Sequence, residues 1–364
     1  MKIITGKIGD DYLVYDLRTL QEERLTREAI YTLKDDIVGV SADDVMIYES
    51  VAEWLESYLV TQEMIGEDFC GVKFRVGKED MTVRRMTTGF DYMNFTEDLR
   101  EYISMSGTSD NCTAFINRVA AENKGVFRFP SFVRGIDYLS TNQALDVKVF
   151  DGRGVYGLLA SYSFAHTPTL ETLYTPVGHS IEEGLCANSA VKHVEINVAC
   201  EPGDERKIEI KSKAFTHCKQ LQSVVFNGTV YKLGSNCFKS CEALKKITLP
   251  EGLEHIGASC FEESGLRHVH TPATLRLLNN AAFASCKRLT AVHLHKNLEA
   301  IGNGCFANCD KLTQLRLPPN LETIGYRAFP PDIELVVPRN SATSKLLESK
   351  QAEGQLHPCR VRQI

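Results

Sequence analysis

The chain has 364 residues, of which 43% are hydrophobic and 24% charged, and its formal net charge is −6. These values are ordinary for a folded globular protein and exclude a disordered or fibrous chain. The sequence has no run of roughly 18 apolar residues, no signal-peptide pattern at its start and no dense basic stripe. We therefore expect a cytoplasmic protein whose partner is neither a membrane nor a nucleic acid.

Residues 1–109 are predicted to form a separate α+β domain of no recognised family. This segment has 22 acidic and 12 basic side chains, a net charge of −10, whereas the rest of the chain is slightly basic. Short alternating runs typical of strands lie at 12–15, 69–76 and 81–86. An amphipathic run at 47–59 predicts a helix with a buried apolar face. A further helix at 96–103 and a linker of small polar residues at 104–109 are expected to end the domain.

Residues 110–137 are predicted to form a helix and a strand that cap the first coil of a repeat array. Asp110 and Asn111 are typical helix N-caps, Gly125 is a typical helix end, and the run 126–129 leads into a proline. The order D-N-x-x-A-F, then G, then F-P resembles the N-terminal segment of pectate-lyase-like parallel β-helices, which are common in polysaccharide-binding proteins. The resemblance is confined to this segment, because no β-helix coils follow it.

The rest of the chain repeats itself with a period close to 23 residues. The anchors are Phe215, Phe238, Phe261, Phe283, Phe306 and Phe329, at intervals of 22 or 23 residues. A cysteine follows most anchors by three residues and a leucine by six, ahead of an alternating apolar pair that predicts a short strand. One unit cannot bury its apolar face, whereas stacked units share a continuous core. The spacing predicts a right-handed solenoid with short parallel strands at 138–338, of about nine coils of 20–30 residues, and a C-terminal cap at 339–364.

The repeat F-x-x-C-x-x-L-x-x-I-x-L-P-x-x-L-x-x-I, clearest from Phe238 to Ile256, resembles the BspA-like type of leucine-rich repeat. Weaker copies begin upstream at Tyr138, Phe164 and Leu185. The C-terminus resembles the end of that family's arrays, with a last strand, a helix and a closing strand. The resemblance implies a leucine-rich-repeat fold that binds other macromolecules. Many members of the family are surface proteins with export signals, so the cell surface is the alternative location.

The outward side chains of the predicted strands gather four histidines in the C-terminal coils. Because neighbouring strands lie about 4.8 Å apart, His270, His293 and Arg316 are expected to form one row, with His295 further along its own strand. The candidate binding face consists of Lys246, His268, His270, His293, His295, Gln314 and Arg316. Three interpretations stay open: a solvated polar face, a contact surface for a protein or glycan, and a metal site.

A second candidate is a loop between Ile196 and Ile208, where the strand-to-strand interval grows to 30 residues. Its charged residues are Glu201, Asp204, Glu205 and Arg206. Insertions often carry the specificity of a repeat array, and a tolerated surface insertion is an equally good explanation.

The sequence predicts no cofactor and no metal site elsewhere. Residues 152–157 spell G-x-G-x-x-G after a strand-like run, but repeat sequence replaces the helix that a dinucleotide site requires. The C-x-x-x-C pairs Cys237/Cys241 and Cys305/Cys309 occupy repeat positions, which favours buried free thiols over zinc. Free thiols fit a reducing compartment.

We therefore expect a macromolecular binding or scaffold protein, not an enzyme, that uses the strand face of its solenoid to bind a protein partner. A carbohydrate-binding or attachment protein is the alternative, suggested by residues 110–137. A hydrolase in residues 1–109 is a minor alternative, since that segment contains no histidine.

Overall fold

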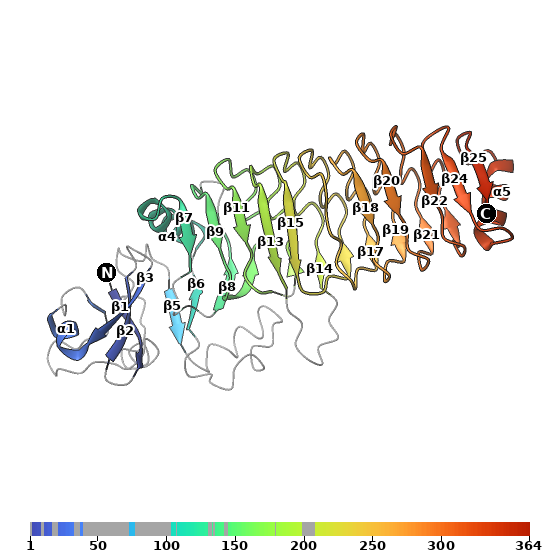
Figure 1. Cartoon of the computed structure of the whole chain (residues 1–364). Helices are drawn as coiled ribbons and strands as arrows, with labels where there is room; N and C mark the ends of the chain where they lie inside the picture. Colours follow the sequence, from blue (N-terminus) through green and yellow to red (C-terminus); the bar gives the residue numbers. More distant parts are fainter. Residues whose placement is uncertain are drawn as a thin grey trace. The chain divides into compact units, whose positions relative to one another are not determined.

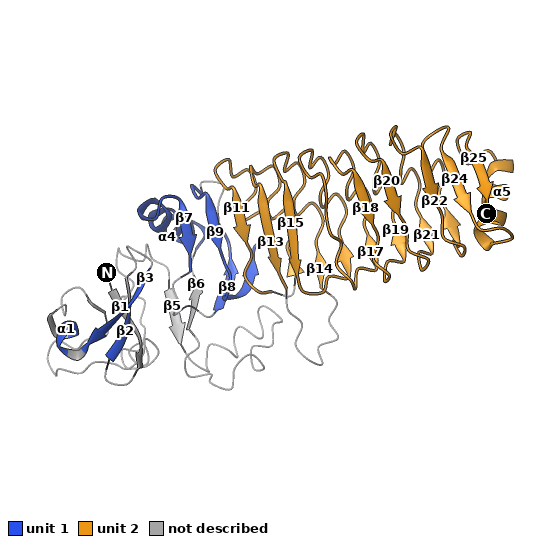
Figure 2. Ribbon diagram, viewed as in Figure 1, with its two compact units in different colours: residues 1–160 blue, residues 161–364 orange. Residues whose placement is uncertain are grey.

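The computed structural model describes residues 2–8, 11–16, 21–32, 37–38, 73–76, 103–106, 108–129, 133, 135–141, 145–178, 180–198 and 208–364. The chain separates into two compact units, unit 1 at 1–160 and unit 2 at 161–364 (Figure 2). The predicted helix at 47–59 and the predicted strand at 81–86 lie outside the described residues.

Unit 1 begins with a small sheet of order β3-β2-β1-β4. Its elements are β1 (Lys2–Ile8), β2 (Asp11–Asp16), β3 (Gln21–Thr26), α1 (Arg27–Thr32) and β4 (Ile37–Val38). The first three strands are antiparallel neighbours, and β4 pairs parallel with β1. Val14 on β2 and Ile30 on α1 are fully buried. The alternating run at 12–15 therefore belongs to a strand, as its pattern predicts.

A second sheet of unit 1 has the order β10-β8-β6-β5. Its strands are β5 (Lys73–Val76), β6 (Ile103–Ser106), β8 (Gly135–Leu139) and β10 (Tyr156–Leu159). Strand β6 lies where the sequence predicts the end of a helix and a linker, so that prediction is wrong for 103–106. The serines of this run alternate with Ile103 and Met105, and this period of two is the pattern of a strand, which the small-residue composition concealed.

Helix α4 (Ser109–Glu122) and strand β7 (Val126–Arg128) follow in the segment predicted to hold a helix and a strand. The N-cap is Thr108, whose Oγ1 accepts a hydrogen bond from the Asn111 N–H at 3.2 Å, so the helix begins slightly earlier than the expected caps. The ring of Phe115 packs edge-on against Phe127, which stacks on Phe150 of strand β9 (Val149–Asp151). These aromatic side chains fill the core of this part of unit 1.

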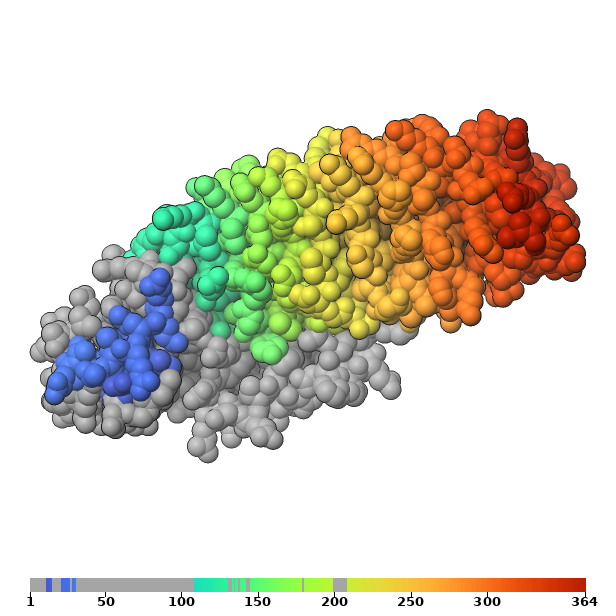
Figure 3. All heavy atoms as spheres, in the orientation of Figure 1, coloured from blue at the N-terminus to red at the C-terminus, as the bar shows by residue number. Residues whose placement is uncertain are grey.

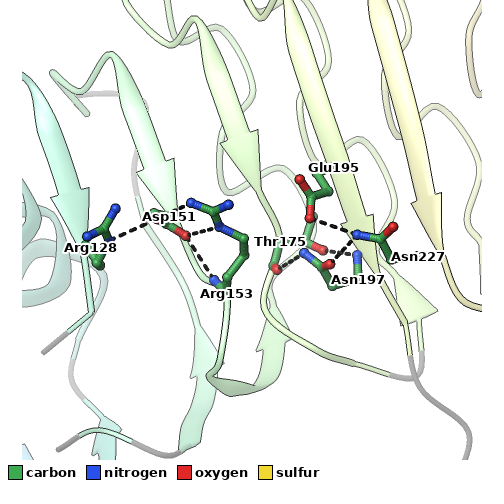
Figure 4. A network of polar contacts seen from close by, with 7 residues as sticks. All are labelled: Arg128, Asp151, Arg153, Thr175, Glu195, Asn197 and Asn227. Atoms are coloured by element: carbon green, nitrogen blue, oxygen red, sulfur yellow. Dashed lines mark hydrogen bonds and ion pairs between the residues drawn. The ribbon is translucent and has the colours of Figure 1, made fainter. Parts of the chain in front are cut away.

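A buried carboxylate links β7 to β9. Asp151 is 3% exposed and accepts hydrogen bonds from Arg128 at 3.0 Å and from Arg153 at 2.8 and 2.9 Å (Figure 4). Burial by itself would raise the pKa of Asp151, but the hydrogen bonds from the two arginines outweigh it and lower the pKa. The glycine-rich run at 152–157 forms the turn after β9 and the first two residues of β10, and no helix follows it.

Unit 2 is a parallel β-solenoid, as the repeat predicts (Figure 1). One wall contains β11 (Thr172–Tyr174), β13 (His193–Asn197), β15 (Ser223–Asn227), β18 (His268–His270), β20 (Ala291–His293), β22 (Gln314–Arg316), β24 (Glu334–Val337) and β25 (Arg360–Gln363). The other wall contains β12 (Ser180–Ile181), β14 (Glu209–Ile210), β16 (Lys232–Leu233), β17 (His255–Ile256), β19 (Leu277–Leu278), β21 (Ala300–Ile301) and β23 (Thr323–Ile324). Successive coils of the unit appear as adjacent bands, from green to red, in Figure 3. Helix α5 (Ala342–Ala352) lies between β24 and β25 in the chain, as the C-terminal pattern predicts.

The anchor phenylalanines form a single stacked column in the core of unit 2. From Phe215 to Phe329, neighbouring ring centroids lie 5.2 to 6.3 Å apart, and the ring planes differ by at most 8°. Their side chains are at most 2% exposed. The 23-residue period therefore identifies the core residues correctly.

The repeat cysteines form a second column beside the phenylalanines. Cys241, Cys286 and Cys309 donate their S–H groups to the main-chain carbonyls of Phe215, Phe261 and Phe283, at 3.0 to 3.2 Å. The ten cysteines among the described residues are all free, and nine of them are buried. The buried cysteines are thus small core residues that also satisfy backbone acceptors between coils.

Glycines set how closely neighbouring coils pack. Gly234, Gly257, Gly302 and Gly325 each follow the inward aliphatic residue of a strand in the second wall. A Cβ atom at Gly325 would lie 2.3 Å from the main-chain nitrogen of Asn303 in the preceding coil. No side chain fits at such a distance, so the glycine allows the two backbones to pack in direct contact.

Candidate functional site

The candidate site lies on the outward side of three neighbouring strands, β18, β20 and β22. Each strand has an exposed, a buried and an exposed residue in sequence. Val269, Val292 and Leu315 point into the core, and the flanking side chains point to solvent because successive residues of a strand face opposite sides. We call the exposed set the histidine face: His268, His270, Ala291, His293, Gln314 and Arg316.

Strand register brings three side chains of the histidine face into one row, as their spacing indicates. His270 pairs with His293, and His293 pairs with Arg316, on successive parallel strands. The two imidazole rings stack with centroids 5.6 Å apart and planes inclined by 24°. Gln314, at the other end of β22, makes a hydrogen bond with Glu334.

His295 differs from its expected position on the strand. β20 ends at His293, and His295 lies in the turn beyond it, half-buried. The turn is held by the buried hydroxyl of Thr271, which accepts a hydrogen bond from the His295 N–H at 2.8 Å and donates one to the His293 carbonyl at 3.3 Å. The Nδ1 atom of His295 is buried and has no hydrogen-bond partner within the described part of the chain.

Lys246 is exposed but is not on a strand, because the described segment from 242 to 254 forms none. A hydrogen bond from the Arg267 N–H to the Lys245 carbonyl at 3.1 Å sets this segment beside the coil of β18. The predicted loop residues Glu201, Asp204, Glu205 and Arg206 lie outside the described residues.

A cavity of about 340 Å³ opens beside the end of the histidine face. It is lined by Val292, His293, Leu294, His295, Lys296, Arg316, Leu317, Pro318, Pro319 and Pro338. We call it the His295 cavity. Its walls combine apolar side chains with imidazole, ammonium and guanidinium groups, and its lining contains no acidic residue.

The cationic groups of this cavity differ from those that bridge neighbouring coils of unit 2. Several lysines and arginines pair with carboxylates of a neighbouring coil, as in Lys239–Glu262 at 2.9 Å and Lys287–Asp310 at 2.8 Å. Lys296 and Arg316 are exposed and make no hydrogen bond or ion pair with the described part of the chain. Their charges are therefore open to an external ligand.

A metal site at the histidine face has less support than a site for an anion. Among the described residues, no group of three or more His, Cys, Asp or Glu side chains is placed to hold a metal ion. The register also sets the Arg316 guanidinium beside His293, where its positive charge would repel a cation.

A second polar cluster, on β13 and β15 and at the residue after β11, makes most of its hydrogen bonds within itself. Asn197 donates its main-chain and side-chain N–H groups to Thr175 at 2.9 and 2.8 Å (Figure 4). Asn227 donates to Glu195 at 2.8 Å and to Asn197 at 2.9 Å. Both amides use their donors within the cluster, so it serves mainly to align the coils.

The sequence analysis missed Lys296 and the three prolines that line the His295 cavity. The repeat sequence itself contains a feature that could have pointed to this cavity. Residue 295 follows the inward leucine of its coil at the position that Pro250 and Pro318 occupy in other coils. A histidine at a proline position of the repeat marks a coil that departs from the common pattern.

Comparison with known proteins gives the following matches. Residues 208–335 match, in six copies, the family described as "BspA type Leucine rich repeat region". Among solved structures, the chain is similar to the Leucine Rich Repeat protein of T. pallidum, with 20% identity and a TM-score of 0.37 over 60% of this chain and 85% of that chain. It is also similar to the pneumococcal vaccine antigen PcpA, with 12% identity and a TM-score of 0.32 over 64% and 68% of the two chains. A leucine rich cell surface protein from Faecalibacterium prausnitzii has 16% identity and a TM-score of 0.31 over 68% and 75%.

No curated protein matches the chain. Within the described residues, no helix has both the length and the apolar character needed to cross a membrane.

Proposed function

We propose that this protein is a scaffold that binds another protein through its histidine face, a role consistent with the match of residues 208–335 to a BspA-type leucine-rich repeat region. The observation that carries the proposal is the row of His270, His293 and Arg316, exposed on three successive strands of a rigid wall. The proposal assigns no catalytic reaction to the chain.

The chemistry of the row favours a protein partner. Arginine is enriched in protein interfaces, where its guanidinium combines contact area with directional hydrogen bonds. The positive charge of the histidine face is limited to a few side chains. It is less dense than the basic surfaces of nucleic-acid-binding proteins. Unpaired donors on a fixed strand wall suit the carboxylates and main-chain carbonyls of a partner.

The free, buried thiols support a reducing compartment, and hence the cytoplasm, as the place of action. A glycan partner is the alternative ligand for the same face, and the experiment below separates the two.

Photo-crosslinking from the centre of the histidine face tests the proposal. Ala291 is exposed on β20 and pairs with His268, so a benzoylphenylalanine at this position would touch any protein docked on the face. We expect a discrete protein adduct after irradiation of native host cells, detected by gel shift and mass spectrometry. The adduct should disappear when His270→Ala and His293→Ala are added, because those changes remove two side chains of the contact row.

The matched control places the same crosslinker at Tyr326, which is 49% exposed and follows β23 in the other wall. The proposal predicts that the Ala291 adduct is absent there. The same adducts from both positions, or no protein adduct from Ala291, would contradict it. Circular dichroism of each variant checks that the solenoid is folded.

A further inference from the structure

We infer that the His295 cavity binds a carboxylate group of the partner protein. That the carboxylate belongs to a partner protein rests on the proposed function. That the cavity binds an anion rests on its lining residues alone. The cavity has four nitrogen-bearing side chains, on His293, His295, Lys296 and Arg316, and no acidic side chain. Such a lining attracts an oxyanion and repels a metal cation.

The basic groups of the cavity are available to a ligand. Arg316 and Lys296 carry full positive charges that no described carboxylate neutralises, unlike the paired cations of neighbouring coils. The planar guanidinium of arginine presents two parallel N–H groups that match the two oxygens of a carboxylate. Arg316 is therefore the expected principal contact, with Lys296 as a second charge.

His295 supplies a polar group that the fold does not use. Its Nδ1 atom is buried without a hydrogen-bond partner among the described residues, although buried polar atoms are nearly always paired. The hydrogen bond from its N–H to Thr271 holds the backbone of this turn in place. The coils on either side have a proline at the same position, Pro272 and Pro318, which has no polar side chain to offer. The unsatisfied imidazole is thus particular to the coil that forms the cavity.

The apolar part of the lining suits the aliphatic stem of an acidic side chain. Pro318, Pro319 and Pro338 are on the wall beside Arg316, together with Leu317. Prolines are rigid, so this wall needs little ordering when a ligand binds. A cavity of about 340 Å³ is at the small end of ligand sites, which fits one or two side chains rather than a large cofactor.

Peptide binding to the purified full chain tests this inference. The probe is fluorescently labelled acetyl-tetraglutamate amide, measured by fluorescence anisotropy, with the corresponding tetraglutamine amide as the neutral control. We expect saturable binding of the glutamate peptide only. Arg316→Gln should weaken binding at least about tenfold, because it removes a charge-assisted pair of hydrogen bonds. Lys296→Gln should weaken it less, because ammonium makes a less directional contact.

The matched control is Arg288→Gln. Arg288 is also exposed and unpaired within the described residues, but it does not line the His295 cavity. Its replacement should change the affinity less than twofold. Equal weakening by Arg288→Gln and Arg316→Gln would show non-specific attraction and overturn the inference. All three variants alter exposed side chains, so their melting temperatures should match that of the wild type.

Two competitors identify the source of the anion. An unlabelled peptide with a free C-terminal carboxylate and no acidic side chain tests chain ends, and inorganic phosphate tests other oxyanions. Displacement by the C-terminal carboxylate peptide supports a carboxylate site, whereas equally effective displacement by phosphate would overturn the assignment to carboxylates. If the peptide fails to bind but the Ala291 adduct persists, this inference falls and the proposed function stands. If the peptide binds but no Ala291 adduct forms, the proposed function falls and the anion site stands.

Discussion

Phe261→Ala is expected to lower the free energy of unfolding by about 3 to 5 kcal/mol, the usual cost of removing a buried aromatic ring. Phe261 is fully buried, and its ring stacks between Phe238 at 5.4 Å and Phe283 at 5.2 Å. Each coil rests only on its neighbours, so a cavity in mid-array weakens two interfaces at once. Urea titration followed by circular dichroism measures the change.

Tyr326→Ala is the matched control for this prediction. It removes an aromatic ring of similar size that is 49% exposed, with the Arg327 guanidinium packed over it at 5.0 Å. The expected loss is below about 1 kcal/mol, because exposed side chains contribute little to the core. Equal losses for the two variants would mean that stability does not reside in the column of phenylalanines.

Raising the pH above 9 is expected to destabilise the protein through its buried thiols. Burial raises the pKa of Cys218 to about 11, and it raises the pKa values of Cys186, Cys237 and Cys241 well above their ordinary value. A thiol with a raised pKa stabilises the fold fully below the unfolded pKa near 9. It loses that contribution as the pH rises towards the folded pKa. For Cys218 the loss is about 2 kcal/mol by pH 11.

Urea unfolding at pH 7.5, 9, 10 and 11 measures this effect, with Cys218→Ala as the control. Tyrosines and lysines also titrate in this range, so the comparison between wild type and variant isolates the thiol. We expect the stability of the wild type to fall more steeply with pH than that of Cys218→Ala. Parallel curves for the two proteins would be inconsistent with a protonated, buried thiol at this position.

The solenoid was predictable because each structural position recurs in several repeats of the sequence. The column from Phe215 to Phe329 and the thiols beside it recur at one period, so a wrong interpretation of one copy is corrected by the others. Unit 1 has no such redundancy. Its strand β6 combines serines with Ile103 and Met105, and composition alone suggested a linker. The N-cap at Thr108 likewise depends on local geometry that neighbouring Asp110 and Asn111 obscured.

The candidate site was predictable only where it follows the strands. His270, His293 and Arg316 lie in one row because strand register depends on the repeat spacing, which the sequence displays. Much of the His295 cavity is lined by residues that follow β20, β22 and β24, where the period of two no longer holds. The expected exposure of His295 assumed that β20 continued beyond His293, whereas β20 ends there and Thr271 makes hydrogen bonds to His293 and His295.

The close fit at Gly257 and Gly325 has a consequence for how such a protein changes length over generations. Internal coils present the same phenylalanine and nearly the same backbone contact to both neighbours. A tandem duplication of one 23-residue unit would therefore insert a coil that finds a matching surface on either side. Once duplicated, one copy can keep the structural residues while the other acquires new ones in its turns. The histidine that stands at a proline position in the coil of β20 is the kind of difference that such a history leaves behind.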